Sequence, residues 1–314
     1  MFQASKVIDY IKIAVQNADI NYLTTHSFLD FNRVISETTG EYQKYVVAKH
    51  HFCQIKVYDS GFVQFSGSIH KMWNSIHGIK APNYDKLTKR QKSTYKGFNG
   101  NQFTIDNIIE IRNYLQFLLG CKPHEMIFQN IEFGVNTTLD FNPNQFIKGL
   151  LYHNGTMFEN KYNRSFACVP HDRYTLKLYN KSLQYGMPTH SLRVELHYKR
   201  MEDLKVCGIK TFADINTSTL SKAKDQLLKR FDEVMYFDKT IDKNSLTKHE
   251  KRLILRYANP SYWMDDLQSN HRYREKKKLT EMIQHKSKNL KQQIRESIIQ
   301  KCVTINRLSK SEIV

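Results

Sequence analysis

Three segments in the middle of the chain alternate between apolar and polar residues with a period of two, and this pattern constrains the fold more than any other feature. The segments are residues 126–139, 173–181 and 191–199. Because successive side chains of a β-strand point to opposite faces of its sheet, each segment has one apolar and one polar face. The same alternation is also typical of an antiparallel sheet with one solvated face and no chemistry. If the three strands share a sheet, one polar surface carries Glu132, Tyr179, Lys181, Arg193, Glu195 and His197.

The rest of the chain before residue 216 adds a hairpin and two helices. Residues 45–68 form two extended runs joined at Asp59-Ser60-Gly61, where a glycine permits a tight turn. Helical spacing predicts one helix at 104–119, with Thr104 as its N-cap, and a second at 144–153. We expect both helices to pack on one face of the sheet.

Helical patterns replace strand patterns from about residue 217 onward. They cover residues 221–235, residues 247–258 and a basic stretch at 271–301 that could be two helices. The predicted fold class is therefore α+β. An antiparallel or mixed β-sheet domain with packed helices occupies residues 1–215, and a helical domain occupies residues 216–314.

The chain carries a large positive charge that is concentrated near its C-terminal end. It has 48 Lys and Arg against 30 Asp and Glu, a formal net charge of +18. Residues 270–310 hold twelve of these cations and only three acidic residues, which a solvated helix face would also explain. The surplus suits DNA, because each cation that meets a phosphate releases a condensed counterion. We predict that the helical domain binds DNA through Arg272, Arg274, Lys276, Lys277 and Lys278.

Several classes of protein lack their characteristic signals in this sequence. No apolar run approaches the roughly 20 residues of a membrane-spanning helix, and the N-terminal segment contains no signal-peptide cleavage site. We therefore expect a cytoplasmic protein with no membrane partner. The five cysteines include no C-x-x-C pair, and neither H-E-x-x-H nor a glycine-rich phosphate-binding loop occurs. These absences argue against disulfide scaffolds, zinc proteases, P-loop NTPases and dinucleotide enzymes.

The polar surface of the three central strands has the groups needed to attack a phosphodiester. Glu132 and Glu195 suit a hard divalent cation, Mg²⁺ or Mn²⁺, which polarises a phosphate oxygen. Tyr179 is the candidate nucleophile. Lys181 and Arg193 are candidate catalytic cations, which we expect to favour the phenolate of the tyrosine and to bind the phosphate.

Six short blocks along the chain add a family resemblance. They are GSIHKMW, GFNGNQF, IEFGVNTTL, LKLYNKSLQ, LRVELHYKR and GIKTFADI. Their order and spacing, within residues 7–215, resemble the gene II replication initiators of filamentous phages and related plasmid and phage proteins. Members of that family start rolling-circle replication by nicking one strand of a supercoiled origin with a tyrosine. The tyrosine stays joined to the 5′ phosphate while the free 3′ hydroxyl primes synthesis.

The resemblance assigns roles to individual positions. The family tyrosine and lysine fall on Tyr179 and Lys181, and the acidic residue of the earlier strand falls on Glu132. The arginine and glutamate of the R-x-E block fall on Arg193 and Glu195. The His-hydrophobic-His motif of many rolling-circle nucleases is missing, so the expected metal set is based on carboxylates.

The remaining expectations concern further contacts and partners. His70 and Lys71 are candidates for DNA contact, with a structural turn as the alternative. Asn136 and His197 are candidates for a third metal ligand, although a lone histidine on a polar strand face is more often solvated. The resemblance implies origin DNA, duplex and single-stranded, as substrate. It also implies a host helicase and polymerase as partners in the cytoplasm of a bacterial cell.

Two other functions fit the same sequence. A non-enzymatic DNA-binding replication initiator or repressor would read the duplex with its helical domain, use the sheet as scaffold, and tolerate the loss of Tyr179. An RNA-binding module would use the basic sheet and its exposed aromatic residues to hold unstacked bases, and would not nick supercoiled DNA. The function we predict is the metal-assisted tyrosine nickase, with a 5′-phosphotyrosine intermediate.

Overall fold

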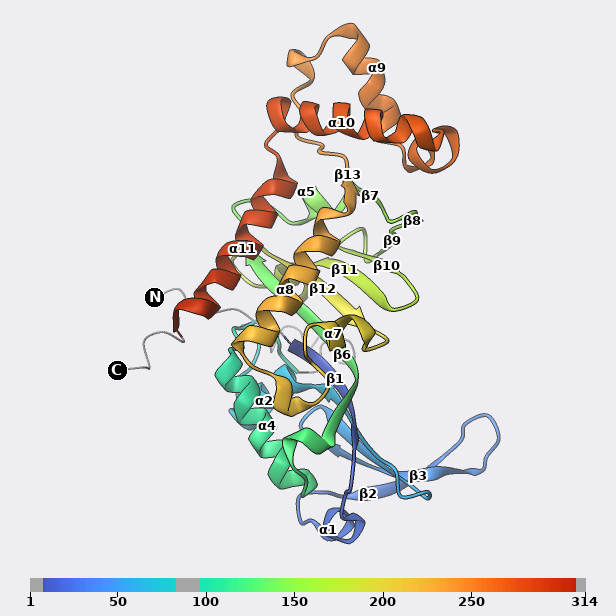
Figure 1. Ribbon diagram of the computed structural model, residues 1–314, viewed down its shortest axis with the longest axis vertical. Coiled ribbons are helices and arrows are strands. Elements are labelled where there is room, and N and C mark those ends of the chain that lie inside the picture. The colour runs from blue at the N-terminus through green and yellow to red at the C-terminus, as the bar shows by residue number, and fades with distance from the viewer. Residues whose placement is uncertain (1–7, 83–96, 309–314) are drawn as a thin grey trace.

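A ten-stranded antiparallel sheet forms the centre of the protein, as the computed structural model shows for residues 8–82 and 97–308 (Figure 1). Its strand order is β2-β3-β4-β5-β1-β6-β12-β11-β10-β9, and a small second sheet has the order β13-β7-β8. The predicted α+β class is confirmed. The strands are β1 (Ile8–Val15), β2 (Phe31–Ile35), β3 (Tyr42–His50), β4 (Cys53–Tyr58), β5 (Val63–Ser68), β6 (Met126–Thr138), β7 (Leu150–His153), β8 (Thr156–Met157), β9 (Glu159–Lys161), β10 (Phe166–Pro170), β11 (Tyr174–Asn180), β12 (Ser191–Tyr198) and β13 (Val234–Tyr236).

The helices lie mainly along one side of the sheet and at one end of the molecule (Figure 1). Two of them, α8 and α11, cross β6, and the pair α9 and α10 forms the far end. The helices are α1 (Ile20–Thr25), α2 (Ile69–Ile76), α4 (Ile105–Leu119), α5 (Asn144–Ile147), α6 (Lys181–Tyr185), α7 (Glu202–Val206), α8 (Thr217–Asp232), α9 (Lys248–Tyr257), α10 (Ser269–Lys286) and α11 (Leu290–Leu308). The basic stretch at 271–301 is thus divided between two helices.

The first predicted helix is confirmed at both ends. The Thr104 side chain accepts a hydrogen bond from the backbone of Asn107, which makes it the N-cap of α4. Gly120 ends the helix in the left-handed conformation, with φ +62°. The second predicted helix, 144–153, is wrong beyond Ile147. The following residues form β7 instead, because they pair with β13 from much later in the chain.

The predicted extended run at the start of the 45–68 hairpin is two strands rather than one. His51 and Phe52 both have positive φ, +45° and +63°, and they turn the chain from β3 back into β4. Residues other than glycine rarely adopt this conformation, so no local signal marked the turn. The turn predicted at Asp59-Ser60-Gly61 is confirmed, with Gly61 at φ +83° between β4 and β5.

Two irregularities in the pairing of β1 with β6 change which side chains face the core. The register shifts between Lys12 and Ile13, and on the far side of this shift Met126 and Phe128 are the buried residues of β6. Strict alternation along the strand, counted back from Ile131 without the shift, would instead place Ile127 on the apolar face. Beyond the shift the alternation holds, and Ile131, Phe133 and Val135 are buried. A bulge reverses the facing of every residue beyond it, and composition does not reveal its position.

The buried apolar side chains of the described residues form three clusters, and the two larger ones include residues of the C-terminal helices. Helices α8 and α11 contribute Leu220, Leu227, Ile294 and others to the main core beneath β6 and β12. The second, smaller core joins α9, α10 and the segment between them to the outer end of β7, around Tyr257 and Trp263. Helix α8 therefore shares the main core with the sheet, whereas α9, α10 and the segment between them, called here the helical unit, pack together with Leu151 and Tyr152 of β7.

No helix within the described residues is both long enough and apolar enough to cross a membrane.

The close approach of β6 to β12 yields a test of this packing. A Cβ added at Gly134 would lie 2.5 Å from the Val194 carbonyl oxygen and 2.8 Å from the Glu195 Cα. Both obstacles are backbone atoms, so we expect Gly134→Ala to lower the free energy of unfolding by about 3 kcal/mol in urea denaturation. Gly40→Ala is the control, because Gly40 has φ +69° but nothing within 4 Å. We expect Gly40→Ala to lower the free energy of unfolding by only about 1 kcal/mol. Equal losses for the two variants would contradict the proposed clash at Gly134.

Candidate active site

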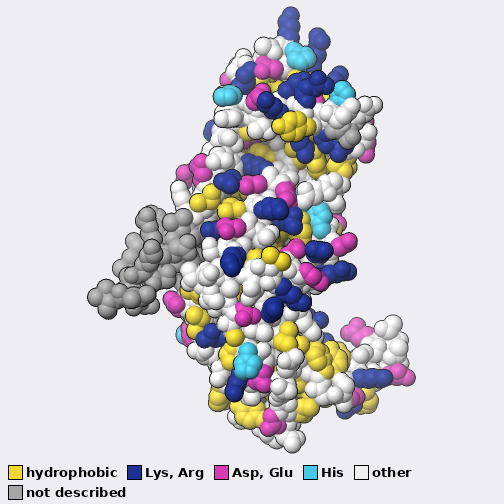
Figure 2. All heavy atoms as spheres, viewed as in Figure 1, with side chains coloured by type: hydrophobic (Ala, Val, Ile, Leu, Met, Phe, Trp, Pro, Cys, Tyr) yellow, Lys and Arg dark blue, Asp and Glu magenta, His cyan; other side chains and the backbone are white. Residues whose placement is uncertain are grey.

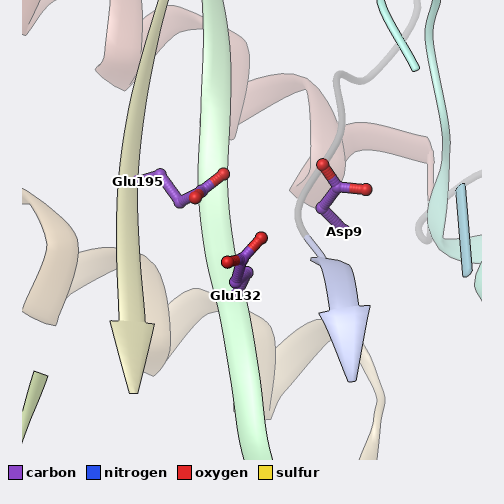
Figure 3. A group of neighbouring side chains, drawn as sticks. All are labelled: Asp9, Glu132 and Glu195. Atoms are coloured by element: carbon purple, nitrogen blue, oxygen red, sulfur yellow. The ribbon is translucent and has the colours of Figure 1, made fainter. Parts of the chain in front are cut away.

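Four neighbouring strands at the centre of the sheet, β1, β6, β12 and β11, bring the polar side chains together on one face. Register places Lys177 opposite Glu195, Tyr179 opposite Arg193, and His197 opposite Glu132. The predicted common polar surface is therefore present. Helices cover the opposite face of these strands, as the ribbons behind the carboxylates show (Figure 3).

Three carboxylates from three different strands converge on this surface. Asp9 of β1, Glu132 of β6 and Glu195 of β12 each offer an oxygen, and these oxygens lie within 4.8 Å of one another (Figure 3). Asp9 and Glu195 are buried and Glu132 is partly buried. Such a set of oxygen donors fits a hard divalent cation such as Mg²⁺ or Mn²⁺. Glu132 and Glu195 were predicted as ligands, and Asp9 was missed.

A second bulge explains why Asp9 was missed. Ile8 pairs with Phe133 and Ile11 with Ile131, so Asp9 and Tyr10 together stand opposite Glu132 alone. Without the bulge, alternation would place Asp9 on the same face as Ile11, in the core. The signal that could have revealed it is an acidic residue at a core position of a strand that is otherwise apolar, because an unpaired buried carboxylate is very unfavourable.

Two cations hold the carboxylates in place. The Lys177 Nζ lies 2.6 Å from one oxygen of Glu132 and 3.1 Å from one oxygen of Glu195. The guanidinium of Arg193, fully buried at 0% exposure, donates to the other oxygen of Glu195 and lies 4.0 Å from Asp9. Burial would raise the pKa of Glu195, but Arg193 and Lys177 outweigh it and lower the pKa to about 2. Lys177 and Arg193 thus hold Glu195 ionised beside Glu132 and Asp9.

His197 and Asn136, the two residues predicted as a third metal ligand, already use their candidate ligand atoms in hydrogen bonds. The Nδ1 of His197 lies 2.7 Å from Glu132, and its Nε2 lies 2.9 Å from the Asn130 amide. Asn136 accepts a hydrogen bond from Arg193 at 3.2 Å. Both residues therefore contact members of the cluster, and Asp9 is the third residue whose oxygen could hold a metal ion with Glu132 and Glu195.

Tyr179 lies beside the carboxylates but is not activated as predicted. Its hydroxyl donates to Glu195 over 3.5 Å, and the Lys181 Nζ lies 5.2 Å from the centre of its ring. Burial raises the pKa of Tyr179 well above its ordinary value, and the charge of Glu195 raises it further. Arg193 acts in the opposite direction but is outweighed. The expectation that the neighbouring cations favour the phenolate is therefore wrong for the protein without metal.

Asn99 links the cations to the carboxylates. Its side chain donates to Asp9 at 2.7 Å and accepts from the Lys181 Nζ at 2.7 Å and from the Tyr185 hydroxyl at 2.6 Å. Lys181 is the first residue of α6 and is buried. Asn99 belongs to the GFNGNQF block, so this block reaches the site through a buried amide rather than through a charge.

A cavity of about 670 Å³ opens over the cluster. Its lining includes Asp9, Lys71, Tyr179 and Glu195, together with Tyr162 and Phe166 from the β9–β10 hairpin. Lys71, predicted as a DNA contact, thus lies at the same cavity. His70 does not, because it is buried at 0% exposure, stacked on Phe103 and within 2.7 Å of the Asn101 side chain. The prediction that His70 contacts DNA is corrected to a structural role in α2.

The five cations predicted on α10 divide into two groups. Arg274, Lys277 and Lys278 are exposed. Arg272 is half-buried and donates to the Leu267 carbonyl at 3.2 Å, and Lys276 lies over the Tyr152 ring. Arg272 and Lys276 therefore contact other parts of the fold, whereas Arg274, Lys277 and Lys278 lie at the surface, where Lys278 pairs with Glu275 at 2.8 Å.

Helix α9 carries an exposed basic face that sequence reasoning missed. Leu255 on this face is 76% exposed, whereas Ile254 and Tyr257 pack into the second core. Glu250, the one acidic residue of α9, pairs with Lys286 at 2.6 Å. Figure 2 shows Lys and Arg side chains gathered over this end of the molecule. Spacing of three and four residues places the exposed cations along one stripe, and they are Lys248, Lys251, Arg252 and Arg256.

Comparison of the sequence with protein-family models and with curated proteins gives no match. The case for a function therefore rests on the residues of the site.

The charge network predicts a specific pH dependence of stability. A carboxyl whose pKa falls from 4.5 to about 2 on folding stabilises the protein above pH 4.5, and this contribution disappears as the pH falls through 2. We expect Glu195→Gln to cost about 3 to 5 kcal/mol at pH 7, because it leaves buried cations unpaired. Measured by urea denaturation, the difference in the free energy of unfolding between Glu195→Gln and the wild type should become smaller between pH 4.5 and pH 2.

Glu202→Gln, at an exposed position, is the control and should match the wild type throughout. If the difference in the free energy of unfolding between Glu195→Gln and the wild type stays constant with pH, Glu195 is not ionised in the folded protein.

Proposed function

We propose that this protein is a replication initiator that nicks one strand of a phage or plasmid origin by metal-assisted transesterification on Tyr179. The observation that carries the proposal is the position of the Tyr179 hydroxyl, 3.5 Å from Glu195, beside three convergent carboxylates in an open cavity. The strongly basic chain supports a nucleic-acid substrate. The gene II resemblance supports origin DNA in a bacterial host cell, with a host helicase and polymerase as partners.

In the proposed reaction, one phosphodiester bond is exchanged for another. The Tyr179 oxygen forms a bond to the scissile phosphorus, and the bond from phosphorus to the 3′ oxygen breaks. The phenolic proton passes to water and the 3′ oxygen takes one from water, so the DNA strand ends as a 5′-phosphotyrosine on one side and a free 3′ hydroxyl on the other. Because the phosphodiester is conserved, the strand can be resealed without ATP.

The residues of the cluster have distinct proposed roles. Asp9, Glu132 and Glu195 would hold Mg²⁺ or Mn²⁺, which when bound polarises a phosphate oxygen and stabilises charge in the transition state. Glu195 orients the Tyr179 hydroxyl, and with a pKa of about 2 it is too weak a base to keep the proton. Lys177 lines the cavity and remains positively charged, so it would stabilise the phosphoryl oxygens, whereas buried Arg193 holds Glu195 in place.

The nucleophile can be tested directly. Wild-type protein, mixed with Mn²⁺ and supercoiled DNA that carries its gene and flanking sequence, is expected to form an SDS-resistant protein–DNA adduct. EDTA and Tyr179→Phe should each abolish the adduct, at least a 1,000-fold loss, on the order expected when a nucleophile is removed. Tyr10→Phe is the matched control, because Tyr10 lines the same cavity but stacks on His197 rather than contacting Glu195.

The outcomes separate the functions that fit the sequence. An adduct that persists in Tyr179→Phe would place the nucleophile elsewhere. Duplex binding without any nick or adduct would favour the non-enzymatic initiator or repressor, and binding to RNA alone would favour the RNA-binding module.

Duplex binding by the helical unit has its own test. We propose that the exposed cations of α9, together with Arg274, Lys277 and Lys278 of α10, contact duplex phosphates. Replacing Lys248, Lys251, Arg252 and Arg256 with Gln should reduce the slope of log affinity against log salt by up to about 3.6, because each lost phosphate contact removes about 0.9.

The matched control removes the same charge from another surface. Changing Lys205, Lys210, Lys222 and Lys229 to Gln, all exposed and outside α9 and α10, should leave the slope within about 1 of wild type. Equal effects of the two quadruple variants would indicate that only net charge matters and would contradict an α9 contact.

A further inference from the structure

A short row of aromatic rings leads from Tyr179 to the rim of the cavity. The Phe166 ring centre lies 5.5 Å from that of Tyr179, and the Tyr162 ring centre lies 6.2 Å from that of Phe166. Phe166 is partly buried, whereas Tyr162 is 72% exposed although it lines the cavity. A large aromatic side chain left this exposed beside a cavity is available to a ligand.

The backbone holds Tyr162 at the rim in an unusual way. Tyr162, Asn163 and Arg164 have φ values of +51°, +53° and +59°, three successive non-glycine residues in the left-handed region. Each such residue costs of order 1 kcal/mol and persists only where the surroundings determine it. Buried Ser165 supplies that support, because its hydroxyl donates to the Tyr162 carbonyl at 2.7 Å and its carbonyl accepts from the Asn180 backbone at 2.9 Å.

Positive charge continues beyond the aromatic row. Arg164 follows Tyr162 in the same turn. Both Arg164 and Lys148 are close enough to exposed Lys239 to repel its positive charge. Three exposed cations therefore gather near the turn that carries Tyr162. A groove with an aromatic face followed by cations is the arrangement that binds single-stranded nucleic acid, where bases stack and phosphates are neutralised.

We propose that Tyr162 is a stacking platform for a base of single-stranded DNA that lies next to the scissile phosphate. Phe166 supports the platform, and Arg164, Lys148 and Lys239 receive the phosphates of the strand as it leaves the cavity. This inference rests on the proposed function for the position of the scissile phosphate. It adds a residue that holds the substrate and takes no part in bond exchange.

The test measures binding separately from cleavage. Fluorescence anisotropy of a labelled dT20 strand is followed with the full-length Tyr179→Phe protein, in which no covalent step can occur. Adding Tyr162→Ala should raise the Kd about tenfold or more, because stacking on an aromatic side chain is largely lost. Adding Tyr162→Phe, which keeps the ring, should leave the Kd within about twofold.

Two further variants separate stacking from charge and from general surface effects. Tyr42→Ala is the matched control, because Tyr42 is 66% exposed on β3, outside the cavity, and its loss should leave the Kd unchanged. Arg164→Gln should reduce the slope of log affinity against log salt by about 0.7, as expected for one lost phosphate contact to a single strand. Tyr162→Ala should leave that slope unchanged.

The results distinguish this inference from the proposed function. If Tyr162→Ala binds dT20 as tightly as its parent, or if Tyr42→Ala loses as much affinity, the platform is overturned even where wild-type protein forms the covalent adduct. If Tyr162→Ala loses affinity and Tyr162→Phe does not, the platform stands even where the adduct assay fails, and the nicking proposal alone falls.

Discussion

The buried ion network around Glu195 is the constraint on which the rest of the site depends. Three carboxylates on neighbouring strands would repel one another, and burial strengthens that repulsion by removing solvent. Lys177 bridges Glu132 and Glu195, and Arg193 pairs with Glu195 from the other side, so Glu195 remains ionised and the carboxylates stay close together. The sheet can therefore carry acidic groups at its centre, where a strand is normally surrounded by apolar neighbours.

The same network accounts for the protonation state of the Tyr179 hydroxyl. The Tyr179 phenol, between buried Glu195 and the ring of Phe166, stays protonated, because both desolvation and Glu195 oppose the phenolate and raise its pKa. A divalent cation held by the carboxylates would reverse this balance by adding positive charge next to the hydroxyl. The proposed nickase would thus be inactive until metal and DNA are both bound, which would protect the cell's DNA from an unprotected nucleophile.

Two parts of the molecule meet DNA in the proposed function, and they differ in character. The cavity over β1, β6, β12 and β11 is lined by polar groups and by the aromatic side chains of Tyr162 and Phe166. The unit formed by α9 and α10 is a small helical body with its own core and an outer basic face. Stacking suits an unpaired strand, and exposed cations suit the phosphates of a duplex. The centre of the sheet and the α9–α10 end of the molecule would therefore hold the two forms of DNA that exist at an origin during nicking.

The sequence alone predicted the α+β class, the capped helix after Thr104, and the shared polar face of Glu132, Tyr179, Arg193 and Glu195. These features depend on local periodicity and on caps, which neighbouring residues determine. Only the tertiary structure decided the role of Asp9, the turn at His51 and Phe52, the burial of His70, and the membership of α8 in the main core. Each of these depends on a bulge, an unusual backbone conformation or a partner distant in sequence, and such long-range pairing leaves no periodic trace in the chain.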